Sequence, residues 1–121
     1  MNDYKNLDVF IKCRALIKDV YLITALYPKE ENYGLTLQIR RAAVSILSNL
    51  SEGMGRQHIN DMINFLHIAR GSLYELEAQL LISQDLKYID DLQFSSVNTQ
   101  LQDCRKILNG FINYQKKKRD V

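Results

Sequence analysis

Hydrophobic residues recur along the chain at intervals of three and four, which is the period of an amphipathic α-helix. The first such pattern covers residues 7–26 and stops before Pro28, a residue that interrupts helices. The second covers residues 35–52 and is followed by glycines that suit a helix end. The third covers residues 61–84 with the most regular heptad spacing, and the fourth covers residues 91–114. We therefore expect four long helices.

No segment shows the strict alternation of a strand, so the chain is predicted to be all-α. The connections between the four segments are short, which favours antiparallel neighbours. A chain of 121 residues can bury a core without disulfides or metal. We predict one antiparallel up-down-up-down four-helix bundle over residues 1–121. Its third helix should begin near Asn60 or Asp61 and its fourth near Asp90 or Asp91, because these side chains are good N-caps.

Charge is distributed unevenly, although the net charge is only +2. Residues 1–100 carry 10 Lys and Arg against 12 Asp and Glu, whereas residues 101–121 carry 6 against 2. Much of the excess lies in Lys116-Lys117-Lys118-Arg119. Cations at this position suit a helix C-terminus, because they complement the helix dipole. They equally suit an anion-binding tail, and the sequence leaves both interpretations open.

Residue types that carry catalysis or bind metals do not form a recognisable set. His58 and His67 lack a second ligand at metal-binding spacing, and both cysteines, Cys13 and Cys104, lie on apolar stripes. Gly53-Met54-Gly55-Arg56 looks like a phosphate loop, but no strand precedes it. We expect no enzymatic activity, no cofactor and no metal site.

A polar line along the second predicted helix contains Arg41. Folding this helix back on the third brings Arg41 level with residue 73, which predicts an ion pair with Glu75 or Glu77. We expect this pair to be architectural. Gly71 and Gly110 lie inside predicted helices, where glycine costs about 1 kcal/mol relative to alanine. Each is interpreted as a place of close backbone approach, within the bundle or across an interface.

The beginning of the sequence is polar and shows no signal-peptide pattern. No stretch approaches the ~18 continuous apolar residues that a membrane span needs. We therefore expect a cytoplasmic protein with reduced cysteines and no membrane contact.

Two strings of residues, one in the second predicted helix and one in the third, occur together in a specific combination. They comprise Tyr33-Gly34-Leu35-Thr36, residues 38–46, Asn49, Glu52-Gly53 and Arg56, followed by Phe65-Leu66 and residues 69–77. With these strings the chain resembles the four-helix bundle proteins encoded in intervening sequences of bacterial 23S ribosomal RNA genes. Leu47 and Ser51 depart from the family pattern, which commonly has proline and alanine there.

The resemblance implies a left-handed bundle without enzymatic activity that assembles into a ring-shaped homo-oligomer, preferably a pentamer. The gene location suggests a connection with RNA. Related bundles serve as accessory subunits of reverse transcriptases, where they bind nucleic acid and the polymerase.

We predict weak, sequence-tolerant binding to RNA or DNA, because a ring multiplies the cations of each protomer and phosphate neutralisation adds up. The candidate residues are Arg40, Arg56, Arg105, Lys106, Lys116, Lys117, Lys118 and Arg119. The alternative is a protein-interaction scaffold, or an accessory subunit of a nucleic-acid enzyme, in which the same surface meets an acidic protein partner.

Overall fold

The computed structural model describes residues 3–121, and these form helices joined by short connections. The elements in chain order are η1 (Tyr4–Asn6), α1 (Asp8–Thr24), η2 (Lys29–Glu31), α2 (Leu35–Met54), α3 (Ile59–Asp85) and α4 (Asp91–Arg119). No strand occurs within residues 3–121, so the predicted all-α class is confirmed.

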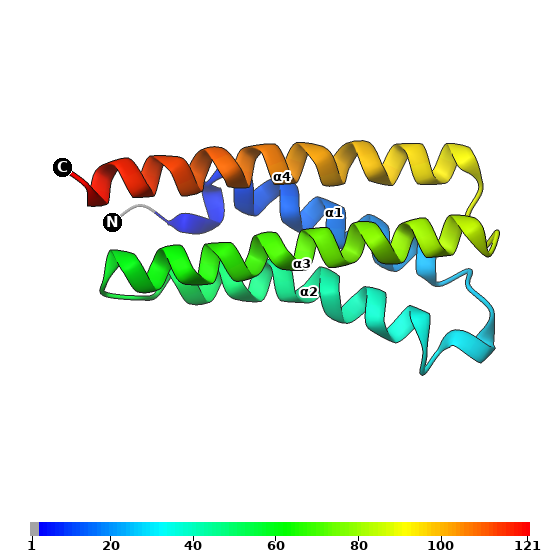
Figure 1. The fold of residues 1–121 in the computed structure, drawn as a ribbon. Helices are drawn as coiled ribbons and strands as arrows, with labels where there is room; N and C mark the ends of the chain where they lie inside the picture. The colour runs from blue at the N-terminus through cyan, green and yellow to red at the C-terminus, as the bar shows by residue number, and fades with distance from the viewer. Residues whose placement is uncertain (1–2) are drawn as a thin grey trace.

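Consecutive long helices run in opposite directions (Figure 1), as predicted for an up-down-up-down bundle. α1 packs against α2 and α4, and α3 packs against the same two helices, so the four enclose one core. The α2–α3 turn, η1 and the end of α4 lie together at one end of the bundle (Figure 1). The α1–α2 and α3–α4 connections lie at the other end. The left hand of the bundle stays a prediction.

The core is made by the residues that set the helical period in the sequence. Leu66, Leu73, Leu76 and Leu80 of α3 are at most 1% exposed, which confirms the heptad. Large side chains buried like these each contribute roughly 1.5–3 kcal/mol through removal from water. They meet equally buried residues from the other helices, including Leu16, Val20, Ile39, Ile46, Leu50, Leu101, Leu108 and Ile112.

The two cysteines lie in this core, Cys13 on α1 and Cys104 on α4, and both are free thiols. Hydrogen bonding with the Cys104 thiol and burial raise the pKa of Cys13. A buried thiol that resists ionisation is a poor nucleophile. Because both cysteines are buried among apolar side chains, they act as small apolar residues where α1 meets α4.

Helix ends follow the predictions in part. Asp90 caps α4, because its carboxylate accepts from the Gln93 N–H at 2.7 Å while its own N–H donates to the Gln93 side chain at 2.9 Å. α3 instead begins at Ile59 with His58 at the cap, so the prediction of Asn60 or Asp61 is wrong. α2 runs on to Met54, and the short turn after it leaves Asn60 already inside the first turn of α3.

The internal glycines divide into two kinds. A Cβ on Gly71 or Gly110 would meet no heavy atom within 4 Å, so close approach within the bundle is the wrong explanation for both. A Cβ on Gly53 would lie 3.1 Å from both the Met62 carbonyl oxygen and the Phe65 Cβ. Gly53 is therefore the glycine that lets α2 and α3 approach closely.

Candidate nucleic-acid interface

The basic residues at the end of the chain belong to α4, which continues to Arg119 rather than stopping near residue 114. Gln115 is only 6% exposed, so the packed side of the helix extends one turn past Ile112. Lys116, Lys117, Lys118 and Arg119 occupy the last turn, where they complement the helix dipole. The interpretation as a helix end therefore holds, and these cations are held by a helix instead of a loose tail.

A basic cluster lies where this part of α4 packs along α3. Arg70 of α3 donates to the Asn109 side-chain oxygen of α4 at 3.1 Å and to Nδ1 of His67 at 3.0 Å. A nitrogen that accepts a hydrogen bond from arginine carries no proton, so His67 is neutral in this arrangement. Burial lowers the pKa of His67, and the charges of Arg70 and Lys116 lower it further. This histidine thus reports a positive local potential.

Glu77 of α3 faces α4, and this carboxylate is already engaged. Arg105 donates to both Glu77 oxygens at 3.1 and 3.2 Å, and its guanidinium stacks on the Tyr74 ring at 4.5 Å. Gln102 also donates to Glu77, at 2.6 Å. The hydrogen bonds from Arg105 lower the pKa of Glu77. Arg105 therefore serves the fold first, and its charge is largely balanced.

At the end of the bundle, Arg119 pairs with Asp120 at 2.8 Å and reaches Asn60 of α3 at 3.4 Å. We use the name basic seam for Arg70, Arg105, Lys116 and Arg119 together with His67. The sequence prediction included three of these five residues and missed Arg70 and His67. Their spacing of three residues on one face of the third helix was a signal that could have been used.

The other candidate cations lie apart from the basic seam. Arg40 caps the end of α1, donating to the Thr24 hydroxyl at 2.9 Å and to the Tyr21 carbonyl at 3.2 Å. Arg56 pairs with Glu52 at 2.6 Å beside the α2–α3 turn. Lys106 is exposed on α4 and, within residues 3–121, forms no ion pair. The eight candidates therefore do not form one continuous site.

The predicted pairing of Arg41 with Glu75 or Glu77 is wrong. Arg41 is exposed and makes no ion pair within the described part of the chain, residues 3–121. Glu77 faces α4, and Glu75 accepts from Gln79 at 3.3 Å. The Ser45 and Ser72 hydroxyls meet at 2.8 Å, which places α2 three residues further along α3 than the assumed register.

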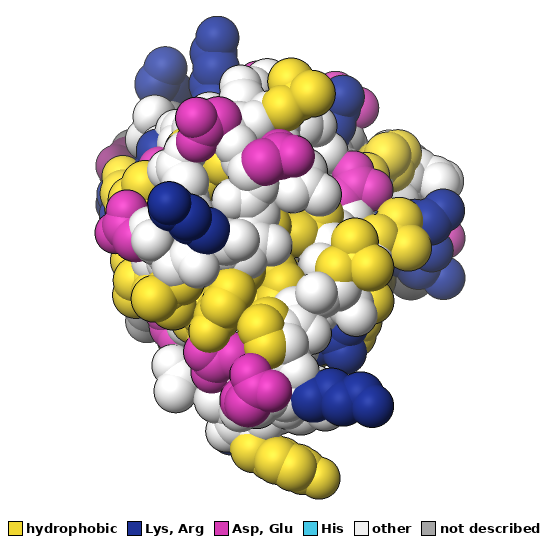
Figure 2. Space-filling model, turned by 90° about the vertical axis from the view of Figure 1, so that its right-hand side faces the viewer, with side chains coloured by type: hydrophobic (Ala, Val, Ile, Leu, Met, Phe, Trp, Pro, Cys, Tyr) yellow, Lys and Arg dark blue, Asp and Glu magenta, His cyan; other side chains and the backbone are white. Residues whose placement is uncertain are grey.

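The end of the bundle away from the basic seam is acidic. Its connections carry Lys29 and Lys87 against Glu30, Glu31, Asp85, Asp90 and Asp91. Figure 2 views this end and shows both acidic and basic side chains around exposed hydrophobic ones. The negative charge of these connections repels a polyanion, so electrostatics favour binding of a polyanion at the opposite end of the bundle.

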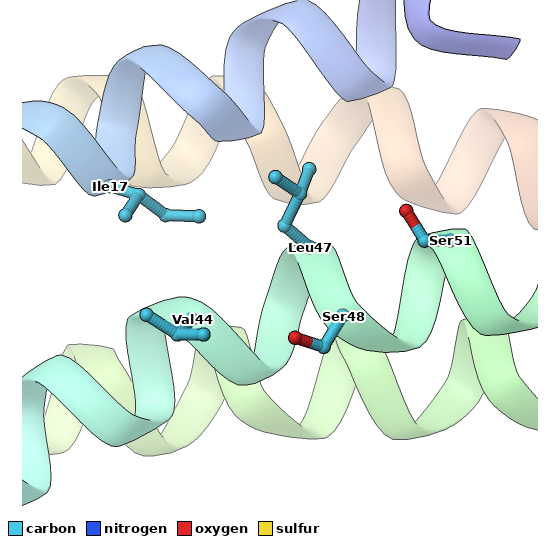
Figure 3. Close-up of a pocket in the computed structure, with 5 residues that line it drawn as sticks. All are labelled: Ile17, Val44, Leu47, Ser48 and Ser51. Carbon is cyan, nitrogen blue, oxygen red and sulfur yellow. The ribbon is translucent and has the colours of Figure 1, made fainter.

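A shallow groove runs along α2 on the side of α1. One hollow of about 420 Å³ is lined by Ile17 of α1 and by Val44, Leu47, Ser48 and Ser51 of α2 (Figure 3). A second, of about 670 Å³, shares Val44 and Ser48 with it and continues to a lining of Tyr21, Leu37, Arg40, Arg41, Ser45 and Asn49. We call the two together the α1–α2 groove. None of its lining residues is acidic.

Other kinds of site have no support in the described residues. Among residues 3–121, His, Cys, Asp and Glu do not gather in a group of three that could hold a metal ion. None of the described helices combines the length and hydrophobicity that crossing a membrane requires.

These features define an up-and-down helical bundle protein with cations concentrated along one helix pair. The family profile of the 23S rRNA-intervening sequence protein matches residues 5–110 of the chain. The chain belongs to this family, as the resemblance indicated.

A solved structure supports the same assignment. The fold is similar to that of a protein of unknown function from the S23 ribosomal protein family of Bacteroides thetaiotaomicron, with a TM-score of 0.77 and 28% sequence identity. The similarity covers 86% of this chain and 97% of that one. No curated protein sequence matches the chain.

Proposed function

We propose that this protein is a non-enzymatic homo-oligomer that binds RNA or DNA weakly and without sequence preference through the basic seam. The observation that carries the proposal is the placement of Arg70 and Lys116 beside a neutral His67. Arg119 lies further along α4, where it pairs with Asp120, and Arg105 already neutralises Glu77. Phosphates that bind such a cluster release counterions, and this release needs no contact with the bases.

Two further exposed lysines lie in the last turn of α4. Lys117 and Lys118 continue this turn beside Lys116, whereas Lys106 lies two to three turns earlier on the helix, apart from the basic seam. Each protomer offers few phosphate contacts, so single-protomer affinity is low. Oligomerisation raises it, because linked sites act at high effective concentration.

The test measures binding of a fluorescent single-stranded RNA oligomer at salt concentrations from about 50 to about 200 mM. The double variant Arg70→Gln/Lys116→Gln should bind more weakly, and its plot of log affinity against log salt should flatten by about 1.4 units of slope, because each phosphate contact to a single strand contributes about 0.7. Lys12→Gln/Lys87→Gln removes the same charge away from the basic seam and should bind as the wild type does. The proposal fails if the wild type retains no RNA at low salt, or if both variants lose binding equally.

His67 supplies an independent readout. A phosphate held next to Arg70 and Lys116 offsets the positive potential that lowers the pKa of His67, so bound RNA should raise that pKa. An NMR titration of the histidine ring with and without RNA measures the change. His58, at the α2–α3 turn, is the internal reference, and a change confined to His58 would contradict the assignment to the basic seam.

The second candidate function is a protein-interaction scaffold. The α1–α2 groove favours it, because Val44 and Tyr21 are 42% and 39% exposed beside polar side chains that also line the groove. In that case RNA binding is absent and the groove, rather than the basic seam, carries the activity.

A further inference from the structure

Two surfaces of the protomer are exposed, partly apolar and opposite in charge. The first is the α1–α2 groove, whose apolar lining includes Ile17, Tyr21 and Val44. Arg40 and Arg41 line it from α2. On α1, Arg14 and Lys18 are exposed and lie within one turn of Ile17, so they add positive charge at its edge. The groove is therefore a basic surface with an apolar floor.

The second surface is the outward side of α3. Six exposed residues follow one another there at helical spacing, which we call the α3 stripe: Asp61, Ile68, Gly71, Glu75, Ala78 and Ile82. Ile68 and Ile82 are about half exposed, at 51% and 47%. The stripe contains no Lys or Arg, because Arg70, the one basic residue of α3, faces α4. It is an acidic surface with apolar ridges.

We infer that the α3 stripe of one copy docks into the α1–α2 groove of a second copy. The inference rests on the oligomeric part of the proposed function and names its interface. Charge decides the pairing, since the cations of the groove match Asp61 and Glu75 of the stripe, whereas groove against groove or stripe against stripe brings like charges together. Apolar side chains on both surfaces are then removed from water at the same contact.

Shape supports the same pairing. Glycine inside a helix is unfavourable, yet nothing in the protomer lies within 4 Å of a Cβ placed on Gly71. A helix that settles against small residues such as Ser45 and Ser48 of the groove can approach closely where it lacks a side chain itself. Gly71, at the middle of the α3 stripe, supplies that gap.

The pairing also gives Arg41 an acidic partner. Arg41 forms no ion pair within residues 3–121, and Glu75 meets only the neutral side chain of Gln79. Between copies, Arg41 of the groove faces the acidic α3 stripe in which Glu75 is central. The contact joins two different surfaces, so a pair of copies keeps one groove and one stripe free for further copies, and repetition closes a ring or continues as a filament.

The experiment breaks each surface separately. Ile68→Lys/Glu75→Lys disables the α3 stripe, and Arg41→Glu/Val44→Glu disables the α1–α2 groove. All four positions are exposed, so both variants should keep the helical content and thermal stability of a folded protomer. Light scattering should give each variant the protomer mass of 14.1 kDa. An equimolar mixture should form a dimer of one copy of each, because one intact groove still meets one intact stripe.

Matched controls place the same chemical changes elsewhere. Leu92→Lys/Asp103→Lys alters an exposed leucine and an exposed carboxylate of α4 and should assemble as the wild type does. The inference is overturned if either surface variant stays oligomeric, or if the mixture stays monomeric. An oligomeric wild type with unaffected variants leaves the proposed function standing without this interface. A monomeric wild type at micromolar concentration removes both the interface and the oligomeric part of the proposed function.

Discussion

α3 packs against α2 on one side and against α4 on the other, and different kinds of side chain form the two contacts, which we call the α2–α3 seam and the α3–α4 seam. Toward α2 the contact consists of small groups: the Ser45 and Ser72 hydroxyls at 2.8 Å, buried Ala42 and Ala69, and Gly53 close to Met62. Toward α4 it consists of long polar side chains, with Glu77 and Arg70 bonded to residues of α4. The first seam depends on close fit, and the second depends on charge.

The difference shows why the basic seam can carry a function. Close packing leaves no space for a ligand, and a change of one methyl group is felt there. Long polar side chains partly exposed to solvent can exchange a protein partner for a phosphate with little change in the backbone. One helix therefore combines a rigid contact on one side with an adaptable, charged one on the other.

The largest expected effect is in the core shared by both seams. Leu73 is 0% exposed, so Leu73→Ala should lower the free energy of unfolding by ~2–5 kcal/mol through lost burial and a residual cavity. Urea unfolding followed by circular dichroism measures it. An unchanged midpoint would contradict the packing of α3 described above.

A smaller effect isolates the close fit of the α2–α3 seam. Gly53→Ala places a Cβ 3.1 Å from backbone of α3, whereas Gly71→Ala places one in open space. Both variants gain the helix propensity of alanine, so the difference between their free energies of unfolding should equal the steric cost at Gly53. We expect Gly53→Ala to be less stable than Gly71→Ala by ~1–3 kcal/mol. The comparison is made at protomer concentrations below assembly, because Gly71 belongs to the inferred interface. Equal stabilities would show that the seam is looser than the contacts indicate.

The smallest effect concerns the charged seam and depends on pH. Glu77→Gln should cost about 1 kcal/mol near neutral pH, because the pair with Arg105 is partly exposed. The pKa of Glu77 is lowered in the folded protein, so the stability that it contributes is complete above the unfolded pKa of 4.5. That contribution is lost as pH falls through the lower, folded pKa, and the variant and the wild type should then converge. The exposed pair of Glu52 and Arg56 is the control, and Glu52→Gln should change stability little at any pH.

The sequence was sufficient to predict the helices and most of the core residues, because hydrophobic periodicity is a local property of each segment. The capping box at Asp90 was likewise visible, since it involves residues three apart. The start of α3 was not, because Asn60 and Asp61 are better capping residues than His58, whose side chain makes no capping hydrogen bond. The last turn of α4 was left open, because Lys and Arg at a chain end look the same in a helix and in a loose tail.

Contacts between helices were harder to predict, because register is set by packing along the whole seam. The assumed register of α2 on α3 was off by three residues, nearly one helical turn. The predicted pair fails because of the direction in which the side chains face, since Glu77 points toward Arg105 of α4 while Arg41 is exposed on α2. The spacing of Arg70 and His67 is visible in the sequence, but the role of Arg70 depends also on Asn109, which lies 39 residues away. A single sequence does not show which distant residues meet.

The two buried thiols allow the rate of local opening of the bundle to be measured. An alkylating reagent reaches Cys13 or Cys104 only when α1 separates from α4, since both are at most 1% exposed. The rate of their modification therefore measures how often that seam opens, as hydrogen exchange does for backbone amides. The sequence contains no other cysteine, so the rate of thiol modification reports the local opening of this contact alone. The α1–α4 contact lies on the side of the bundle opposite the α2–α3 contact.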